Sequence, residues 1–352
     1  MENKSTFEII LGTYEQFVLG FFYDKKANEL TQSFATHSHS GSVRCVSYNK
    51  GILASGGTDD HIIIYNLKTR REQSTLNHHS STITCLQFTN KCSHLLSGCQ
   101  DGSLGIVRVG SWQLEKLWEK AHRDVAVVDI AVHQSNKLAL TLGADGILKT
   151  WNLVKGRTAY IINLNSKCKD ARTLNLIKFC PNYESFLLTG STMIYIWSLE
   201  SGGLIKSIEN KSRVVCCDWL GEKLIVGYEN GSIGVVDVES DEIEIHEAHS
   251  ARVKCLAVIE DFIVSASSDG KIIVWDKELN EMTTHSAECR FTCMSVVLNA
   301  EVTDASKVVE ISESNDNDVD DEEIEAVSEE EQEIKVKRKN KSNKEKNIKK
   351  KK

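Results

Sequence analysis

The sequence predicts an all-β fold, a β-propeller of seven four-stranded blades. One observation is a phrase of the form Ser-x-x-x-Asp-Gly-x-Ile-x-x-Trp-Asp, which ends at Asp276 and has a close copy ending at Asn152. Looser copies end at Asn66, Arg108, Ser198 and Asp237, so successive ends lie 42, 44, 46, 39 and 39 residues apart. A period of about 40–45 residues with a Trp-Asp-like close is typical of propellers with four-stranded blades. The second observation is that the two ends of the chain supply complementary parts of one further blade.

Each unit repeats the same order of elements. A loop with a histidine precedes an alternating strand, an apolar strand ending near Ser or Thr, a tight turn, a strand ending in Trp or its substitute, and a more polar fourth strand. Alternation with period two places one face of each strand against the next blade. The turns contain Asp-Gly or Asn-Gly, which supply the positive backbone angles of a two-residue hairpin turn. They lie at residues 101–102, 145–146, 230–231 and 269–270.

Six complete units begin with clearly recurring strands. These opening strands are expected at 43–48, 83–88, 127–132, 174–179, 214–219 and 253–258. A seventh opening strand at 291–296 has no continuation, whereas residues 6–36 predict three strands with no opening strand before them. Pairing 290–298 with 6–36 completes a seventh blade and leaves no open sheet edge that would invite aggregation. We therefore expect the propeller to span residues 1–300.

Composition excludes several classes of protein. The 352 residues are 41% hydrophobic, enough for a large core, and carry a formal charge of −8. The longest apolar runs are far shorter than the ~20 residues that cross a bilayer, so no membrane association is expected. The amino terminus lacks a basic stretch followed by an apolar core, so no secretory signal is expected. Eleven scattered cysteines, an odd number, favour free thiols in a reducing compartment.

The charge is distributed unevenly along the chain. Residues 301–334 hold fifteen acidic residues and one lysine, whereas 335–352 hold eleven basic residues and one glutamate. We expect two disordered segments, one acidic and one basic, with the alternative that the end of the chain is merely solvated. Basic clusters serve nuclear import or bind nucleic-acid phosphates. The import candidates are Lys335, Lys337, Arg338, Lys339 and Lys341, and Ser328, which precedes three glutamates, is a phosphorylation candidate.

These repeats resemble the WD-repeat family, in which His, Ser or Thr, Asp and Trp of one blade form a buried hydrogen-bonded set. The resemblance implies two full sets, His122, Thr141, Asp145 and Trp151, and His249, Ser265, Asp269 and Trp275. A third set has a phenol in place of the indole: His39, Ser55, Asp59 and Tyr65. A fourth lacks the aromatic residue: His79, Ser97 and Asp101. The units ending at Trp197 and Val236 depart further, and we expect those blades to be less rigid.

A narrower resemblance is to the PAK-interacting WD-repeat proteins, nucleolar factors of large ribosomal subunit assembly. It is carried by residues 12–16 with Phe21, 78–86, 137–157 and 264–270, together with the Lys-rich end. It implies a non-catalytic scaffold in the nucleus and nucleolus, a monomer within a larger complex of assembly factors and pre-ribosomal particles. The basic tail could add RNA contact. The alternative is a negative regulator that binds the regulatory region of a p21-activated kinase.

The sequence disfavours a catalytic site and a metal site. His and Asp in one blade could form a catalytic pair, but catalytic sets do not recur once per blade, and buried polar groups need partners in any case. Neither His78-His79 nor Cys289 with Cys293 has the ligand spacing of a zinc site. The chain has no phosphate-binding loop or dinucleotide fingerprint, so no cofactor is expected. Scattered cations such as Lys68, Arg70 and Arg71 could form a basic rim but are more simply solvated.

Overall fold

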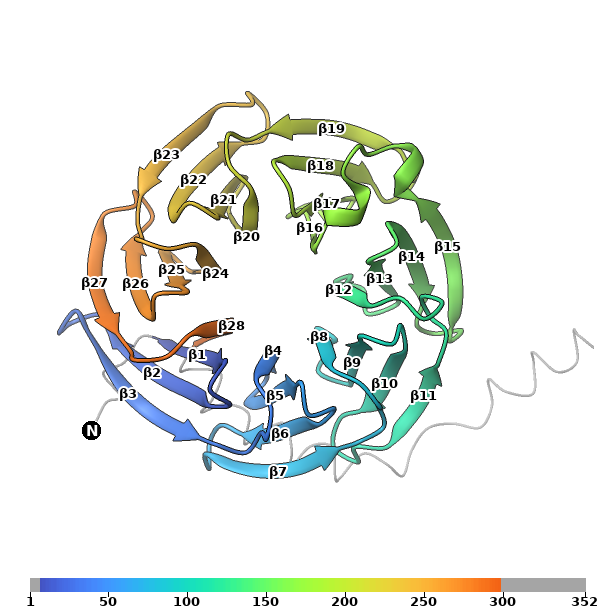
Figure 1. Ribbon diagram of the computed structural model, residues 1–352, viewed down its shortest axis with the longest axis horizontal. Helices are drawn as coiled ribbons and strands as arrows, with labels where there is room; N and C mark the ends of the chain where they lie inside the picture. Colours follow the sequence, from blue (N-terminus) through green and yellow to red (C-terminus); the bar gives the residue numbers. More distant parts are fainter. Residues whose placement is uncertain (1–6, 299–352) are drawn as a thin grey trace, which may run out of the picture. The chain divides into compact units, whose positions relative to one another are not determined.

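The computed structural model describes residues 7–298, and this part of the chain forms seven four-stranded antiparallel sheets around one axis (Figure 1). The prediction of an all-β, seven-bladed propeller is confirmed. In each blade one strand lies nearest the axis and three follow outward. The predicted division of the remaining chain into 301–334 and 335–352, with its disorder, lies outside the described residues.

Six blades each consist of four consecutive strands. The first three are β4 (Val43–Asn49), β5 (Ile52–Gly57), β6 (Ile62–Asn66), β7 (Arg71–Leu76); β8 (Ile83–Phe88), β9 (His94–Cys99), β10 (Leu104–Arg108), β11 (Leu114–Trp118); β12 (Val127–Val132), β13 (Leu138–Gly143), β14 (Ile147–Asn152), β15 (Arg157–Asn163). The next three are β16 (Leu176–Phe179), β17 (Ser185–Thr189), β18 (Met193–Ser198), β19 (Leu204–Glu209); β20 (Val214–Leu220), β21 (Lys223–Tyr228), β22 (Ser232–Asp237), β23 (Ile243–Glu247); β24 (Val253–Ile259), β25 (Phe262–Ser267), β26 (Lys271–Asp276), β27 (Glu281–Ser286).

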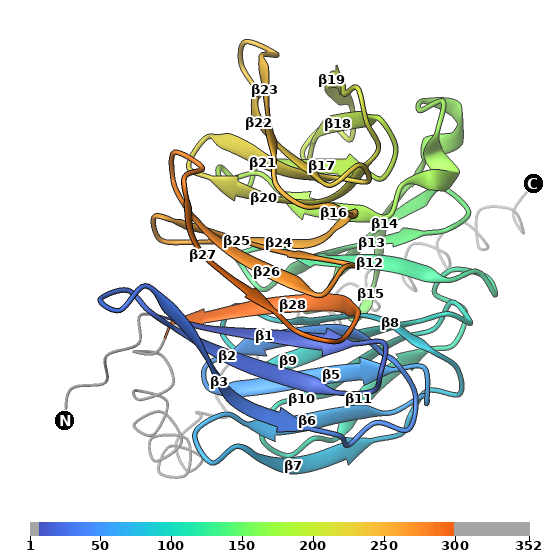
Figure 2. The ribbon, with the colours of Figure 1, turned by 60° about the vertical axis from the view of Figure 1, so that its left-hand side comes forward.

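The seventh blade joins the two ends of the described chain. Its strands are β28 (Phe291–Leu298), β1 (Phe7–Thr13), β2 (Val18–Asp24) and β3 (Glu29–Thr36), in that order from the axis. β28 pairs antiparallel with β1 along its length, from Phe7 opposite Leu298 to Gly12 opposite Cys293. Figure 2 shows β28 beside β1 from the side, in agreement with Figure 1. The ring is therefore closed by main-chain hydrogen bonds between residues far apart in sequence.

Burial follows the order of the strands within a blade. Every residue of β1 is buried, and so are most residues of the second and third strands of the other blades, with β14 the least buried of them. Outer strands such as β7 and β27 are mostly exposed, which matches their polar sequences. Apolar clusters lie between neighbouring blades, for example Phe7, Phe21 and Phe262 between the seventh blade and the β24–β27 blade. The core is thus a series of sandwiches between sheets rather than one central mass.

One cation of the suggested basic rim is instead a contact between blades. Arg70 lies 2.8 Å from the carboxylate of Glu8, whose side chain is fully buried on β1. The guanidinium also lies over the rings of Phe22 and Phe34, at 5.3 and 5.0 Å from their centroids. Arg70 therefore links the seventh blade to the β4–β7 blade. This correction could not come from sequence, because Glu8 and Arg70 belong to different blades.

Two short helices interrupt the pattern of strands. They are the 3₁₀ helices η1 (Leu164–Ser166) and η2 (Ala171–Thr173), in the connection from β15 to β16. Within the described residues no helix has the length and apolar character of a membrane span. All eleven cysteines are free, and most are buried.

Candidate functional site

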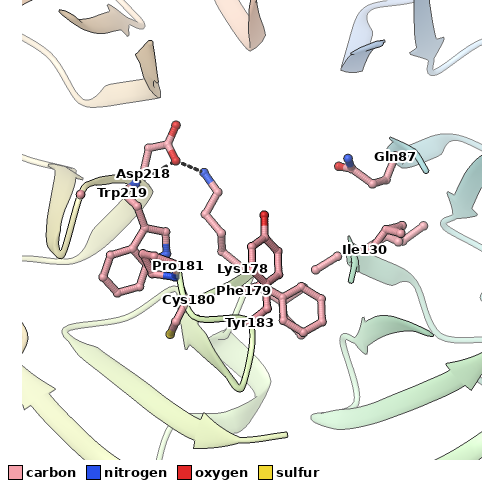
Figure 3. A pocket seen from close by; sticks show the side chains of 13 residues that line it. Gln87, Ile130, Lys178, Phe179, Cys180, Pro181, Tyr183, Asp218 and Trp219 are labelled. Atoms are coloured by element: carbon pink, nitrogen blue, oxygen red, sulfur yellow. Dashed lines mark hydrogen bonds and ion pairs between the residues drawn. The ribbon is translucent and has the colours of Figure 1, made fainter. Parts of the chain in front are cut away.

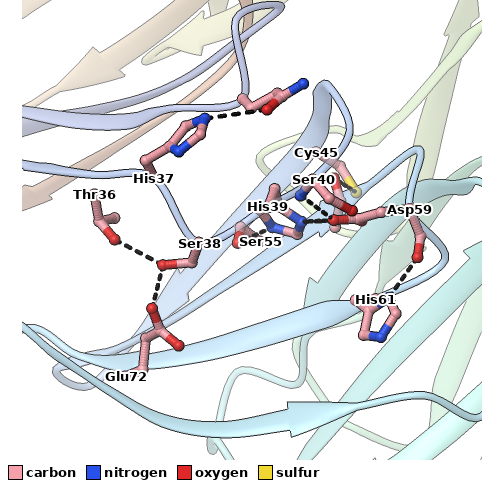
Figure 4. Close-up of polar contacts among 12 residues, drawn as sticks. Thr36, His37, Ser38, His39, Ser40, Cys45, Ser55, Asp59, His61 and Glu72 are labelled. Carbon is pink, nitrogen blue, oxygen red and sulfur yellow. Dashed lines mark hydrogen bonds and ion pairs between the residues drawn. The ribbon is translucent and has the colours of Figure 1, made fainter.

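The polar set of the β4–β7 blade is assembled as the resemblance implied (Figure 4). His39 Nε2 lies 2.7 Å from Ser55 Oγ, and His39 Nδ1 lies 3.0 Å from both carboxylate oxygens of Asp59. Asp59 also accepts from the backbone N–H of Ser40 at 2.8 Å. The Tyr65 hydroxyl is 3.5 Å from Ser55 Oγ, a long contact. The set joins the loop before β4 to the turn after β5.

Two blades carry the indole form of this set. Trp151 Nε1 donates to Thr141 Oγ1 at 2.8 Å, and His122 Nε2 lies 2.7 Å from the same oxygen. Ser265 Oγ has the same two partners, Trp275 Nε1 and His249 Nε2, each at 2.8 Å. Since the indole can only donate, the hydroxyl accepts from it and uses its remaining hydrogen-bonding capacity for the imidazole. One buried hydroxyl therefore satisfies two rings.

The aspartates of these blades do not bind the histidines. Asp145 accepts from the backbone N–H of Ile147, and Asp269 accepts from Ser250 Oγ and the backbone N–H of Lys271. The Nδ1 atoms of His122 and His249 have no hydrogen-bond partner among the described residues. The implied His–Asp hydrogen bond is thus present with His39 and absent here, because each carboxylate is held by its own turn.

The β8–β11 blade replaces the missing indole with a second histidine. Ser97 Oγ lies 2.7 Å from His79 Nε2 and 3.0 Å from His78 Nε2. His79 Nδ1 faces Ser103 Oγ at 2.9 Å rather than Asp101, whose carboxylate binds the backbone N–H of Ser103. A β-carbon at Gly105 would lie 2.7 Å from His78 Nε2, so glycine makes the room. The pair His78–His79 is structural.

The two divergent blades contain other polar pairs. In the β20–β23 blade the buried Tyr228 hydroxyl donates to Asn210 Oδ1 at 2.7 Å. In the β16–β19 blade the Tyr195 hydroxyl donates to Asp170 at 2.5 Å, and Asp170 directly precedes η2. Sequence reasoning missed both pairs because their residue types differ from those of the repeat. The lower rigidity expected of these blades stays a prediction.

Burial determines the protonation of the histidines in these sets. It lowers the pKa of His79, His122 and His249 to about 4 each. It also lowers the pKa of His39, although the Asp59 carboxylate acts in the opposite direction. The rings are neutral at neutral pH and act as hydrogen-bonding spacers. The hydroxyl residues that they contact, Ser55, Ser97, Thr141 and Ser265, are fully buried.

A cavity of about 540 Å³ lies beside the axis at the inner ends of four blades (Figure 3). Apolar and aromatic side chains form most of its wall. The residues labelled there are Gln87, Ile130, Lys178, Phe179, Cys180, Pro181, Tyr183, Asp218 and Trp219. The turn after β16 is held over it by His133 Nε2, which lies 3.2 Å from the Tyr183 carbonyl oxygen. Such a cavity suits an apolar side chain of a partner.

Its charged groups are already engaged. Lys178 Nζ lies 2.5 Å from Asp218, which also accepts from the backbone N–H groups of Trp219 and Val258. Burial alone would lower the pKa of Lys178, but the Asp218 carboxylate raises it above its ordinary value. Nearby, burial raises the pKa of Asp129 to about 6, against two backbone N–H donors that lower it. These groups connect blades across the inner strands.

The structure brings together no metal site in the part of the chain that it describes. No group of three or more His, Cys, Asp or Glu side chains there could hold a metal ion. Cys289 and Cys293 have a pKa raised to about 11 by burial. The candidates in the tail, Ser328 and the import cluster 335–341, lie outside the described residues. The predicted site residues of the propeller therefore belong to its internal structure. The surface formed by its loops is the candidate for its function.

Comparison with known proteins supports this interpretation of the repeats. The family model described as "WD domain, G-beta repeat" matches residues 28–66, 70–106 and 241–276. "p21-activated protein kinase-interacting protein 1-like" of Xenopus laevis is 31% identical over 319 residues, covering 86% of this chain and 85% of the relative. "Shk1 kinase-binding protein 15" of Schizosaccharomyces pombe is 30% identical, covering 86% and 87%. "Protein MAK11" of Saccharomyces cerevisiae is 25% identical, covering 84% of each. The chain belongs to the family of WD-repeat proteins that includes the p21-activated protein kinase-interacting proteins.

Proposed function

We propose that this protein is a non-catalytic scaffold in the assembly of the large ribosomal subunit in the nucleolus. The observation that supports it is that the repeated polar side chains serve the structure. The His, Ser and Thr side chains are hydrogen-bonded to one another inside each blade, where they stabilise the fold. The surface formed by the loops is therefore the part of the propeller that is available to bind partner molecules.

The assembly role itself rests on the resemblance to the PAK-interacting WD-repeat proteins. A rigid ring would position assembly factors and pre-ribosomal RNA or protein, while the basic segment 335–352 would supply nuclear address and contact with RNA phosphates. A fluorescent reporter fused to 333–352 should accumulate in the nucleus. A reporter spread evenly between nucleus and cytoplasm would remove the import role.

The test is affinity purification of the tagged full chain, with and without nuclease, followed by gradient sedimentation. We expect co-sedimentation with large-subunit precursors, and loss of those precursors when the protein is depleted. Association that survives nuclease would indicate protein contacts, and association that nuclease removes would indicate RNA. Absence from every precursor fraction, with normal subunit levels after depletion, would contradict the proposal.

A second candidate, a negative regulator of a p21-activated kinase, is favoured by the names of two relatives. Those relatives are a p21-activated protein kinase-interacting protein and a Shk1 kinase-binding protein. Regulation predicts that the full-length chain binds a purified kinase regulatory region and lowers the activity of the kinase. Binding without any change in kinase activity would leave docking and remove regulation.

A further inference from the structure

At the end where the chain enters each blade, most innermost strands pair with the second strand of the blade in the same register. In six blades the first residue of the innermost strand pairs with the last residue of the second strand, as Val43 does with Gly57 and Val253 with Ser267. In each of these the pairing skips the next residue, which is therefore bulged. Bulges re-aim a side chain out of the regular ladder. We call the residues directly before and after the first strand residue the mouth positions.

The mouth positions of four consecutive blades carry cations. Arg213 precedes β20, Arg252 precedes β24, Arg290 precedes β28, and Lys254 and Arg44 occupy the bulges of β24 and β4. We call these five residues the cationic arc. The strands β20, β24, β28 and β4 follow one another around the axis (Figure 1). The corresponding positions of β8 and β12 hold only Thr and small apolar residues.

Side chains at the mouth positions reach across to the next blade. Thr292, the mouth residue after Phe291, donates to the Val43 carbonyl oxygen at 2.6 Å, and Thr84 donates in the same way to that of Val127. Lys254 and Arg44 occupy the equivalent position on either side of β28, and both lower the pKa of the Cys293 thiol, which burial raises overall. The two cations thus lie beside the same strand.

Within the described residues none of the five cationic side chains forms an ion pair, although the backbone N–H of Arg290 donates to the Glu15 carboxylate at 3.0 Å. Within residues 7–298, no carboxylate lies at ion-pair distance from any member of the cationic arc. Arg213 donates to the Gly190 carbonyl oxygen at 2.9 Å, and Arg290 lies over the Tyr14 ring at 5.4 Å. The four arginines are exposed and Lys254 is half-buried. Unpaired like charges around one opening focus the field there and attract anions.

Carboxylates surround this cationic centre at a larger radius. In an antiparallel blade the turn between the second and third strands lies at the same end as the mouth positions. Those turns carry Glu15, Asp59, Asp60, Asp101, Asp145, Glu229 and Asp269. The connections between blades at the same end add the cations Lys120, Arg123, Lys167, Lys169, Arg172 and Lys211. A nucleic acid lying across the face would still bring phosphates against the carboxylates of the turns. An acidic polypeptide segment entering at the centre would not.

We propose that the cationic arc binds an acidic segment of a partner protein, flanked by neutral or basic residues that face the carboxylate rim. The inference rests on the proposed function, because it names the chemistry of one partner of the scaffold. It predicts contact at one end of the propeller only, the end opposite the turns that contain Lys50 and Lys68 and opposite the start of β21 at Lys223.

The test uses the full chain and a fluorescein-labelled peptide of six glutamates flanked by lysine pairs, followed by anisotropy. The variant is Arg44→Gln with Arg252→Gln and Lys254→Gln. Its matched control, Lys50→Gln with Lys68→Gln and Lys223→Gln, removes the same charge at the other end. We expect the peptide affinity to fall at least about tenfold in the variant and to change less than about twofold in the control, with equal melting temperatures.

Two outcomes would overturn the proposal. Equal losses in both triple variants would indicate a general effect of net charge. A larger loss for a labelled oligouridine RNA than for the peptide would assign the cationic arc to nucleic acid. Neither outcome affects the sedimentation test above. A protein that fails here and still sediments with large-subunit precursors keeps its assembly role without this contact.

Discussion

A single buried hydroxyl holds two rings in each of three blades. Thr141 and Ser265 each bond one histidine and one tryptophan, and Ser97 bonds two histidines. A buried donor left without a partner costs about 1–3 kcal/mol, so the loss of one hydroxyl affects two groups. The contribution of the motif therefore depends on the hydroxyl more than on the aspartate.

Replacing Thr141 by Val should lower the free energy of unfolding by about 2–4 kcal/mol, since Trp151 Nε1 and His122 Nε2 both lose their partner. Chemical denaturation measures this. Thr141→Ser keeps the hydroxyl, as other blades do, and should cost less than about 1.5 kcal/mol. Equal losses in the two variants would mean that packing, not hydrogen bonding, accounts for the contribution of Thr141 to stability.

The depressed histidines predict acid sensitivity. Their pKa values are about 4 when folded and about 6.5 when unfolded, so between these limits the unfolded chain binds more protons. Stability must therefore fall as pH falls from 6.5 towards 4. Asp129, whose folded pKa is raised to about 6, acts in the opposite sense and offsets one group.

The variant His122→Gln removes one of the histidines that bind a proton on unfolding. Its unfolding free energy, measured from pH 7 to pH 5, should depend on pH less steeply than that of the wild type, by about 1.4 kcal/mol per pH unit. The slope is compared rather than the absolute value, because the substitution also removes packing. An unchanged slope would show that His122 is not held neutral in the folded protein.

At the scale of elements, blades are packed by a recurring contact of glycine, cysteine and a large side chain of the next blade. A β-carbon at Gly98 would lie 2.5 Å from Cys85 Sγ and 2.8 Å from Val127 Cγ1. The same arrangement recurs at Gly12 with Cys293 and Val43, at Gly56 with Cys45 and Ile83, and at Gly227 with Cys216 and Val253. The thiol fills the space that the missing side chain leaves, as a small apolar group does.

Gly98→Ala should therefore destabilise the propeller by about 1–3 kcal/mol through overpacking. The cost should shrink in a Cys85→Ala background, where the sulfur no longer occupies the contact, and a double-mutant cycle measures that coupling. Gly203→Ala is the control, since its β-carbon would meet only Ser201 Oγ, at 3.2 Å. Strictly additive effects of the two substitutions would refute the proposed contact.

At the scale of the whole molecule, the ring depends on β28. This strand pairs with β1 and buries Phe291 and Val297 between neighbouring blades. Without it, β1 would become an open and apolar edge, which favours aggregation. The Glu8–Arg70 contact adds a second link from the closing blade to the β4–β7 blade.

Deleting residues 289–300 should lower the melting temperature by at least ~10 °C or prevent folding, since a loss of several kcal/mol shifts a protein of this size by that amount. Deleting 301–352 should change it far less. Thermal unfolding of the three chains, followed by circular dichroism, provides the comparison. If both truncations leave the melting temperature unchanged, the closing blade contributes nothing to stability.

The amino-acid sequence by itself determined the repeat period, the strand order within a blade and the pairing of the two termini. These follow from local patterns, namely alternation, Asp-Gly turns and an opening strand without a continuation. The resemblance of the repeats to the WD-repeat family implied the hydroxyl, histidine and tryptophan of the regular blades. The hydroxyl stands four residues before the aspartate of its turn and the tryptophan six residues after it, whereas the distance of the histidine from the turn varies.

Only the tertiary structure decided which side chains meet across blades and within irregular ones. His78 replaces an indole at Ser97, Asn210 meets Tyr228, and the carboxylates of Asp145 and Asp269 bind their own turns. The cationic arc likewise emerges only when four innermost strands are placed side by side in register. The physical reason is that these contacts join residues with no fixed sequence separation, so their geometry depends on how twisted sheets pack around the axis.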